Sequence, residues 1–407
     1  MANRLAKWWS KSKKKDDEPS LDDGTPPTFP ALPSQRPSIL TPSSSQESLA
    51  LEATSSSLFF QKLPPELRRR ILEDAFGGHR VHIDLIYDHI PQQQATSVCG
   101  HGSLPLVSRD VGDTDLLQLD TKSPKKWLWR GSVCHRDSPN PGPEGHRIQP
   151  AHDQCRFGVT GSETCNSWPG TKPGKCQIGV LGWLQSCRQA YVEGIDVLYS
   201  TNTFHTASKP ILLNASDVLL RQRLERIAAV ELIWEMEEAP IWSGGGGQAY
   251  KTMRSFWDFL DAAPKLFPNA RSMHISIQWK PQYKIQLPVT MSENYFGYAE
   301  GGILDRVETM ARRLGPHVED FSLAIPSSMY RPRRDRARRN GQKVEQAWKG
   351  GQLERYFHPV PGALHRDGYW IRLGLRDILM PRSQETIDSN NDPRLLQEDW
   401  IMFEPAG

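Results

Sequence analysis

LPPELRRRIL, residues 63–72, and LQSCRQAYVEGIDVLYSTNTF, residues 184–204, are the two stretches that decide the fold of this chain. In the first, two prolines supply the fixed backbone angle that suits the start of a helix. An apolar residue then recurs every four positions, which predicts a short amphipathic helix with this stripe facing inward and the arginines facing mostly outward. The stripe comprises Leu63, Leu67, Ile71 and Ala75, and the arginines are Arg68, Arg69 and Arg70.

The second stretch predicts another helix followed by a short strand. Its apolar residues recur at intervals of three and four, and they are Leu184, Cys187, Tyr191, Ile195 and Leu198. Cys187 is therefore expected on the apolar face, where a buried thiol acts as a small hydrophobic group. Ser200, Thr201 and Asn202 then interrupt the helix before a strand that begins at Thr203 and Phe204.

Taken together, the two stretches resemble a fungal family of uncharacterised proteins whose first helix is F-box-like. The resemblance covers roughly residues 58–330, and the second stretch is its more specific part. It implies a protein-interaction module, with a Skp1-like adaptor as the protein partner. The partner-binding residues that it implies are Leu63, Pro64, Glu66, Leu67 and Ile71.

Two arrangements of the first helix remain open. The stripe can pack inward against the helix that carries Leu184 and Leu198, or part of it can stay exposed to receive a partner helix. More than a hundred residues separate the two stretches, and this favours inward packing as the main role. Pro64, Glu66 and the outer arginines would then be the available docking surface.

Composition limits the classes of protein to consider. The chain has 407 residues, 37% of them hydrophobic, which indicates one core with tails. Fifty basic and 47 acidic residues give a net charge of +3, which excludes a strongly basic binder of nucleic acid. No stretch is apolar enough to predict a transmembrane helix, and the N-terminus lacks the apolar region of a signal peptide. We therefore expect a cytoplasmic or nuclear protein whose six cysteines are thiols.

The chain divides into three parts by composition. Residues 1–57 are rich in Pro, Ser, Asp and Lys and are predicted to be disordered. The resemblance implies that residues 58–330 form the F-box-like domain, with a loop-rich insertion expected at 79–180. Within it, VHIDLIYD (81–88) and KKWLWRGSV (125–133) predict a small sheet, and 137–175 an irregular loop. Residues 331–407 are expected to hold a basic loop, a strand at 369–375 and a polar tail.

A repeating pattern after Thr203 predicts an α/β or α+β fold. Three strand-like segments, AVELIWE (229–235), RSMHISIQ (271–278) and VEDFSLAI (318–325), alternate with helical segments. Such alternation requires right-handed crossovers, so the F-box-like helices should be followed by βα units that form a parallel, leucine-rich-repeat-like sheet. The helices should bury Phe256, Phe259, Leu260 and Ala263, and Leu304, Val307, Ala311 and Leu314.

Two basic patches support an alternative function, a nuclear protein associated with nucleic acid. One is the lysine group near the N-terminus, and the other is RPRRDRARR, residues 331–339, which is expected to be an exposed and solvated loop. Trp127, Trp129 and Arg130 could stack single-stranded bases, although packing on a sheet is favoured. The patches contain Lys11, Lys13, Lys14 and Lys15, and Arg331, Arg333, Arg334, Arg336, Arg338 and Arg339.

No motif in the sequence predicts catalysis, a cofactor or a metal. Cysteine and histidine gather between Cys99 and Cys187, but no C-x-x-C pair brings two thiolates to one ion, so no structural metal is expected. SGGGGQAY, residues 243–250, lacks the Lys-Ser/Thr of a phosphate-binding loop. We therefore expect a non-enzymatic interaction protein that needs no cofactor.

Overall fold

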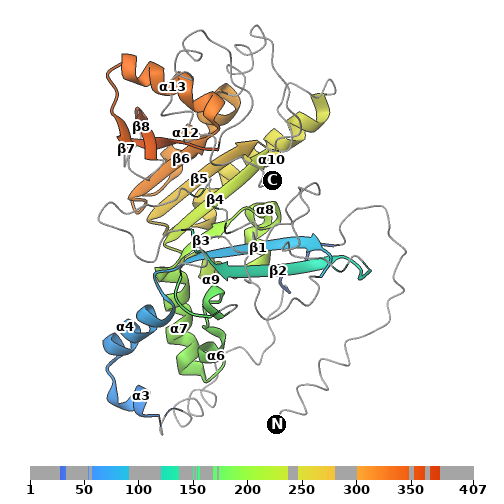
Figure 1. Cartoon of the computed structure of the whole chain (residues 1–407), viewed down its shortest axis with the longest axis vertical. Coiled ribbons are helices and arrows are strands. Elements are labelled where there is room, and N and C mark those ends of the chain that lie inside the picture. Colours follow the sequence, from blue (N-terminus) through green and yellow to red (C-terminus); the bar gives the residue numbers. More distant parts are fainter. Residues whose placement is uncertain are drawn as a thin grey trace, which may run out of the picture. The chain divides into compact units, whose positions relative to one another are not determined.

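The structure is a computed structural model of the whole chain (Figure 1), and the chain divides into two compact units, Met1–Ala31 and Leu32–Gly407. It describes residues 28–33, 54, 57–90, 120, 122–136, 150, 153, 155, 168–171, 174–236, 246–279, 300–347, 353–362 and 367–375. Of the first unit only residues 28–31 are described, and these form neither helix nor strand. Most of the predicted disordered tail, 1–57, and most of the predicted loop, 137–175, lie outside the described residues.

One nine-stranded sheet organises the described part of the second unit, in the order β2-β1-β3-β4-β5-β6-β9-β8-β7. The six strands from β1 to β9 in this order are mutually parallel, while β2 at one edge and β8 and β7 at the other run antiparallel to their neighbours. The strands are β1 Arg80–Asp88, β2 Lys126–Val133, β3 Thr203–Thr206, β4 Ala229–Met236, β5 Ser272–Trp279, β6 Asp320–Ile325, β7 Val344–Ala347, β8 Leu353–Pro359 and β9 Gly368–Leu373.

Helices connect these strands and also precede them (Figure 1). No helix in the described ranges combines the length and apolar character needed to cross a bilayer. The α-helices are α3 Leu58–Lys62, α4 Pro65–Phe76, α6 Leu181–Leu184, α7 Arg188–Thr201, α8 Lys209–Val218, α9 Arg221–Leu224, α10 Gly246–Leu266, α12 Asp305–Arg313 and α13 Ser327–Arg339. Short helices also form at Gly174–Cys176 and Glu300–Leu304.

The predicted α/β class and parallel sheet are confirmed. All three predicted strands of the βα units form, and so does the strand predicted at 369–375. The two strands of the insertion also form, but they do not make a separate small sheet, because β1 pairs with β3 and joins the main sheet. The likeness to a leucine-rich repeat stays a prediction.

Side chains alternate between the two faces of the sheet, and one face carries the main core. Along β4, Val230, Leu232 and Trp234 belong to this core. The Trp234 ring lies 5.4 Å from the ring of Phe256 and 5.2 Å from that of Phe259, both on α10. The apolar faces predicted for α10 and α12 are buried against the sheet. Helix packing on this face therefore explains the large apolar residues at every second position of the strands.

The opposite face carries a polar row that crosses the sheet. His82 on β1 is the register partner of His205 on β3, which in turn is opposite Glu231 on β4. The row continues through His274 on β5 to Ser322 on β6. All five side chains are buried. Burial of polar groups is unfavourable unless they have partners, so a buried polar row of this kind is typical of a functional site.

The arginine run differs from its prediction. Residues 331–339 belong to the helix α13 and not to an exposed loop. Pro332 is the sixth residue of this helix, so it removes the backbone N–H that would otherwise donate to the carbonyl four residues earlier. Met329, Tyr330 and Ala337 are buried and anchor the helix to the core. The arginine-rich composition of residues 331–339 predicts exposure, although these buried residues give the helix an apolar contact with the core.

Candidate functional site

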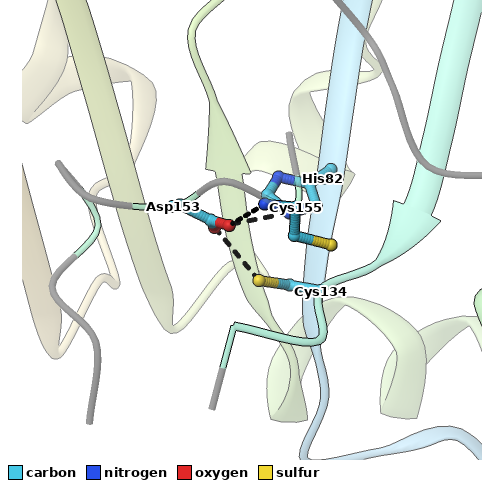
Figure 2. A group of neighbouring side chains, drawn as sticks. All are labelled: His82, Cys134, Asp153 and Cys155. Carbon is cyan, nitrogen blue, oxygen red and sulfur yellow. Dashed lines mark hydrogen bonds and ion pairs between the residues drawn. The ribbon is translucent and has the colours of Figure 1, made fainter. Parts of the chain in front are cut away.

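Four potential metal ligands meet on the polar face of the sheet, next to β1. They are His82 on β1, Cys134 directly after β2, and Asp153 and Cys155 from the segment that follows (Figure 2). Their ligand atoms all lie within 4.8 Å of one another, and each residue is at most 5% exposed. The backbone N–H of Cys134 donates to the carbonyl of Arg80 at 2.8 Å, which extends the β1–β2 pairing and brings Cys134 close to β1. We call these four residues the ligand cluster.

Asp153 lies at the centre of the ligand cluster. Figure 2 shows its carboxylate facing both His82 and Cys134. The Cys134 thiol donates to Oδ2 at 3.0 Å, and Nε2 of His82 lies 3.4 Å from the same oxygen. Oδ1 accepts the backbone N–H of Cys155 at 3.0 Å, and the sulfur of Cys155 accepts the backbone N–H of His135 at 3.3 Å.

A buried charge network surrounds the ligand cluster. Arg136 places Nη1 3.3 Å from Asp153 and Nη2 2.5 Å from Glu231. Glu231 also accepts from Arg80 at 2.9 Å, and its other oxygen lies 3.0 Å from Nδ1 of His205. Arg136 therefore joins the ligand cluster to the polar row. Loss of either carboxylate would leave this buried guanidinium with an unbalanced charge.

The electrostatics keep the carboxylates ionised and the thiol protonated. Burial would raise the pKa of Asp153, but the charges of His82 and Arg136 outweigh it and hold that pKa at about 2. Burial likewise opposes ionisation of Glu231, yet Arg136 holds its pKa well below the usual range. Burial raises the pKa of Cys134 well above its usual value, so without a bound cation its thiol keeps its proton.

Sequence reasoning did not find the ligand cluster. The sequence contains no closely spaced thiol pair, and these ligands come from parts of the chain that only the fold brings together. The usable signal was the concentration of Cys and His after Cys99, together with strands at 81–88 and 125–133 that could pair as neighbours. Such pairing places a residue at the end of one strand next to the start of the other.

The second candidate site is the outer face of α4, where the predicted inward packing is wrong. Leu67 is 52% exposed and Ile71 is 44% exposed, while Ala75 is also exposed and Leu63 is half-buried. The buried residues of α4 are one position further along, namely Arg68, Leu72 and Phe76. Pro64 and Glu66 are exposed, as expected.

Arg68 explains why α4 packs with this orientation. Its guanidinium pairs with Glu193 on α7 at 2.6 Å and donates to the Leu63 carbonyl at 2.7 Å. On the same side, Leu72 and Phe76 form a small core with Val180 and Val197. The large Phe76 gains more from burial than Ala75 would, so the stripe containing Phe76 faces inward and the one containing Ala75 faces outward.

The helix predicted over 184–198 also packs differently. It is divided into α6 and α7, and α7 buries Ala190, Gly194 and Val197. Tyr191 is 40% exposed, although it was expected on the buried face. Cys187 is the N-cap of α7 and accepts the backbone N–H of Ala190, so it does not serve as a buried hydrophobic group.

Among the described residues, those proposed for nucleic-acid contact lie on two separate elements, α13 and β2. Arg334 on α13 pairs with Glu354 on β8 at 2.6 Å, and Arg331 and Arg333 are half-buried, whereas the other three arginines are exposed. The lysine patch near the N-terminus lies outside the described residues. On β2, Trp127 packs against Tyr87 with 5.5 Å between ring centroids, as favoured, while Trp129 is 49% exposed.

Both candidate sites lie in the part of the chain that matches a known family model. No curated protein and no solved structure matches the chain. A family model described as "Domain of unknown function (DUF7730)" matches residues 52–278, which include α4, α7, the polar row as far as His274 and the whole ligand cluster. The chain therefore belongs to the DUF7730 family.

Proposed function

We propose that this protein is a non-enzymatic interaction module that docks a partner through the outer face of α4. The observation that carries the proposal is the exposure of Leu67 and Ile71, large apolar residues one turn apart on a helix whose other face is buried. Exposure of such side chains is unfavourable in water, and a contiguous apolar ridge is the usual mark of a surface that receives a partner.

The construction of α4 suits docking. Arg68, Leu72 and Phe76 fix the helix against α7, so the outer face is held in place before a partner binds. A preorganised surface loses little conformational entropy on binding, which raises its affinity. Residues at i and i+4 on such a face match the grooves and ridges that a second helix presents.

The partner proposed is an apolar helical segment of a Skp1-like adaptor. The support for this choice is the resemblance of LPPELRRRIL to the first helix of an F-box, combined with the outward position of Leu67 and Ile71. Pro64 and Glu66 are exposed at the start of the same helix and would border the contact. This adaptor role deepens the proposal of a general interaction module.

The test is capture of a purified Skp1-like adaptor by the full-length protein. Wild-type protein should bind, while Leu67→Asp and Ile71→Asp should each abolish capture without changing the melting temperature. Leu213→Asp on α8 is the matched control, because Leu213 is 41% exposed on a different helix and should leave binding intact. A known F-box protein confirms that the adaptor is active. Absence of binding by the wild type would refute the adaptor role.

The alternative is a nuclear protein associated with nucleic acid. The observation in its favour is the exposure of Arg336, Arg338 and Arg339 towards the end of α13. Binding through these three charges should be weak and should fall steeply with salt. A fluorescence titration with single-stranded and duplex DNA at two salt concentrations tests this function, and replacement of Arg338 and Arg339 by Gln should remove the binding.

A further inference from the structure

We propose that His82, Cys134, Asp153 and Cys155 bind one structural zinc ion. The four donors are one imidazole nitrogen, two sulfurs and one carboxylate oxygen, all within 4.8 Å of one another. Zinc favours four such donors in a tetrahedron, with edges of roughly 3.3–3.8 Å for bond lengths of about 2.0–2.3 Å. The 3.4 Å separation of His82 Nε2 from Asp153 Oδ2 already matches such an edge.

The hydrogen bonding around His82 points to a missing ligand. Both ring nitrogens are buried; among the described residues Nδ1 has no hydrogen-bond partner, and Nε2 meets Asp153 Oδ2 only at 3.4 Å, outside hydrogen-bond geometry. A buried polar nitrogen left in this state is unfavourable. A zinc ion placed among the four donors would displace the proton from Nε2 and give this buried nitrogen a partner.

The charges around the ligand cluster suit a dication. Two thiolates and one carboxylate carry three negative charges, so a bound zinc ion would leave a net charge of −1. Arg136 supplies a compensating positive charge at 3.3 Å from Asp153. Such an outer partner orients a carboxylate ligand and balances the charge of the bound site.

Backbone donors also support thiolate ligands. The sulfur of Cys155 accepts the N–H of His135 at 3.3 Å, and Asp153 accepts the N–H of Cys155 at 3.0 Å. These bonds hold Asp153 and Cys155 in place, and the bond to Asp153 uses Oδ1, so Oδ2 stays directed at His82. Their geometry is typical of the outer shell of a metal site, in which ligands are themselves hydrogen-bonded.

The choice of zinc, and of a structural role, follows from the donor set and from burial. Soft thiolates combined with imidazole in a four-donor site favour zinc over magnesium or calcium, which prefer oxygen ligands. All four protein positions are filled, whereas catalytic zinc keeps one position for water or substrate. The ion would tie β1 to the end of β2 and to the segment around Asp153, which are distant in sequence.

Metal analysis of full-length protein purified under reducing conditions tests this inference. Wild-type protein should contain about one zinc per chain. Cys134→Ser and Asp153→Asn should each reduce the zinc content to a small fraction of that value. Cys187→Ser is the matched control, because Cys187 lies outside the ligand cluster at the start of α7 and serine can also cap a helix. Its zinc content should equal that of the wild type.

Cobalt provides a second readout that does not depend on folding of the variants. Cobalt in place of zinc in the wild-type protein should produce the visible absorption of a tetrahedral site and a thiolate-to-cobalt charge-transfer band. Absence of both zinc and this spectrum in the wild type would overturn the inference. So would a Cys134–Cys155 disulfide found by mass spectrometry, or full zinc content in Cys134→Ser and Asp153→Asn. None of these results bears on docking by α4.

Discussion

The two faces of α4 should respond oppositely to truncation, and Leu72 and Leu67 form the matched pair that tests this. Leu72 is 3% exposed and packs with Phe76, Val180 and Val197. Leu72→Ala removes apolar contacts and leaves a cavity, so it should lower the free energy of unfolding by about 2–5 kcal/mol. Leu67 is 52% exposed, so Leu67→Ala leaves no enclosed cavity and should cost less than about 1 kcal/mol.

Urea unfolding of the full-length variants, followed by circular dichroism, measures both values. The dependence of the free energy on urea should be equal in the two variants, because neither changes how much surface is exposed on unfolding. A cost for Leu67→Ala as large as that for Leu72→Ala would refute the orientation of α4 described above. Such a result would instead support the inward packing of Leu67 that the sequence predicted. It would also contradict the exposed face of α4 on which the proposed docking depends.

Three further substitutions test other parts of the structure. Gly194→Ala should destabilise the protein by about 1–3 kcal/mol in thermal unfolding, because the added Cβ would lie 2.6 Å from the Trp183 ring. This clash should outweigh the higher helix propensity of alanine. Unchanged stability would contradict the packing of α6 on α7. Burial and Arg372 lower the pKa of His274 to about 3, so the stability that its neutral form contributes is complete above pH 6.5 and is lost as the pH falls towards 3. When the pH falls from 7 to 5, the free energy of unfolding of the wild type should therefore decrease by about 2 kcal/mol more than that of His274→Gln. An equal decrease would contradict the lowered pKa of His274. In thermal unfolding, Arg334→Gln should lower the stability of the protein by about 1 kcal/mol more than Arg339→Gln, because Arg334 pairs with Glu354 on β8. Equal losses of stability in the two variants would refute this contact.

The sheet was predictable from sequence because its strands and helices carry strong local patterns. Segments such as AVELIWE carry large apolar residues at every second position, as a strand with one face covered by helices requires, and the α10 stripe through Phe256 and Phe259 has clear helical spacing. Alternation of the two then implies parallel pairing. Periodicity could not reveal that β1 joins the same sheet, because strand pairing over such a separation depends on tertiary contacts.

The orientation of α4 was not predictable because its sequence contains two competing stripes. Leu67, Ile71 and Ala75 recur every four residues, and so do Leu72 and Phe76 with Arg68. The buried stripe is decided by the ion pair between Arg68 and Glu193, which are 125 residues apart in sequence. A buried arginine is disfavoured unless it is paired, so a single sequence favours the wrong stripe.

The ligand cluster was missed for a related reason. A local motif can be recognised from its spacing. His82 and Cys134 instead come together through the pairing of β1 with β2, and Asp153 lies beside them only in the folded chain. Two of the four ligands lie in a segment with a loop-like composition, where single residues give no periodic signal.

Site-specific photo-crosslinking tests docking through α4 most directly. A photoreactive phenylalanine analogue at Ile71, in the full-length protein, should crosslink to the Skp1-like adaptor, and mass spectrometry should map the product to an apolar helix of that adaptor. The same analogue at Leu213, which is 41% exposed on α8, should give no product. Equal crosslinking from both positions, or none from Ile71 while the adaptor is active towards a known F-box protein, would contradict the account.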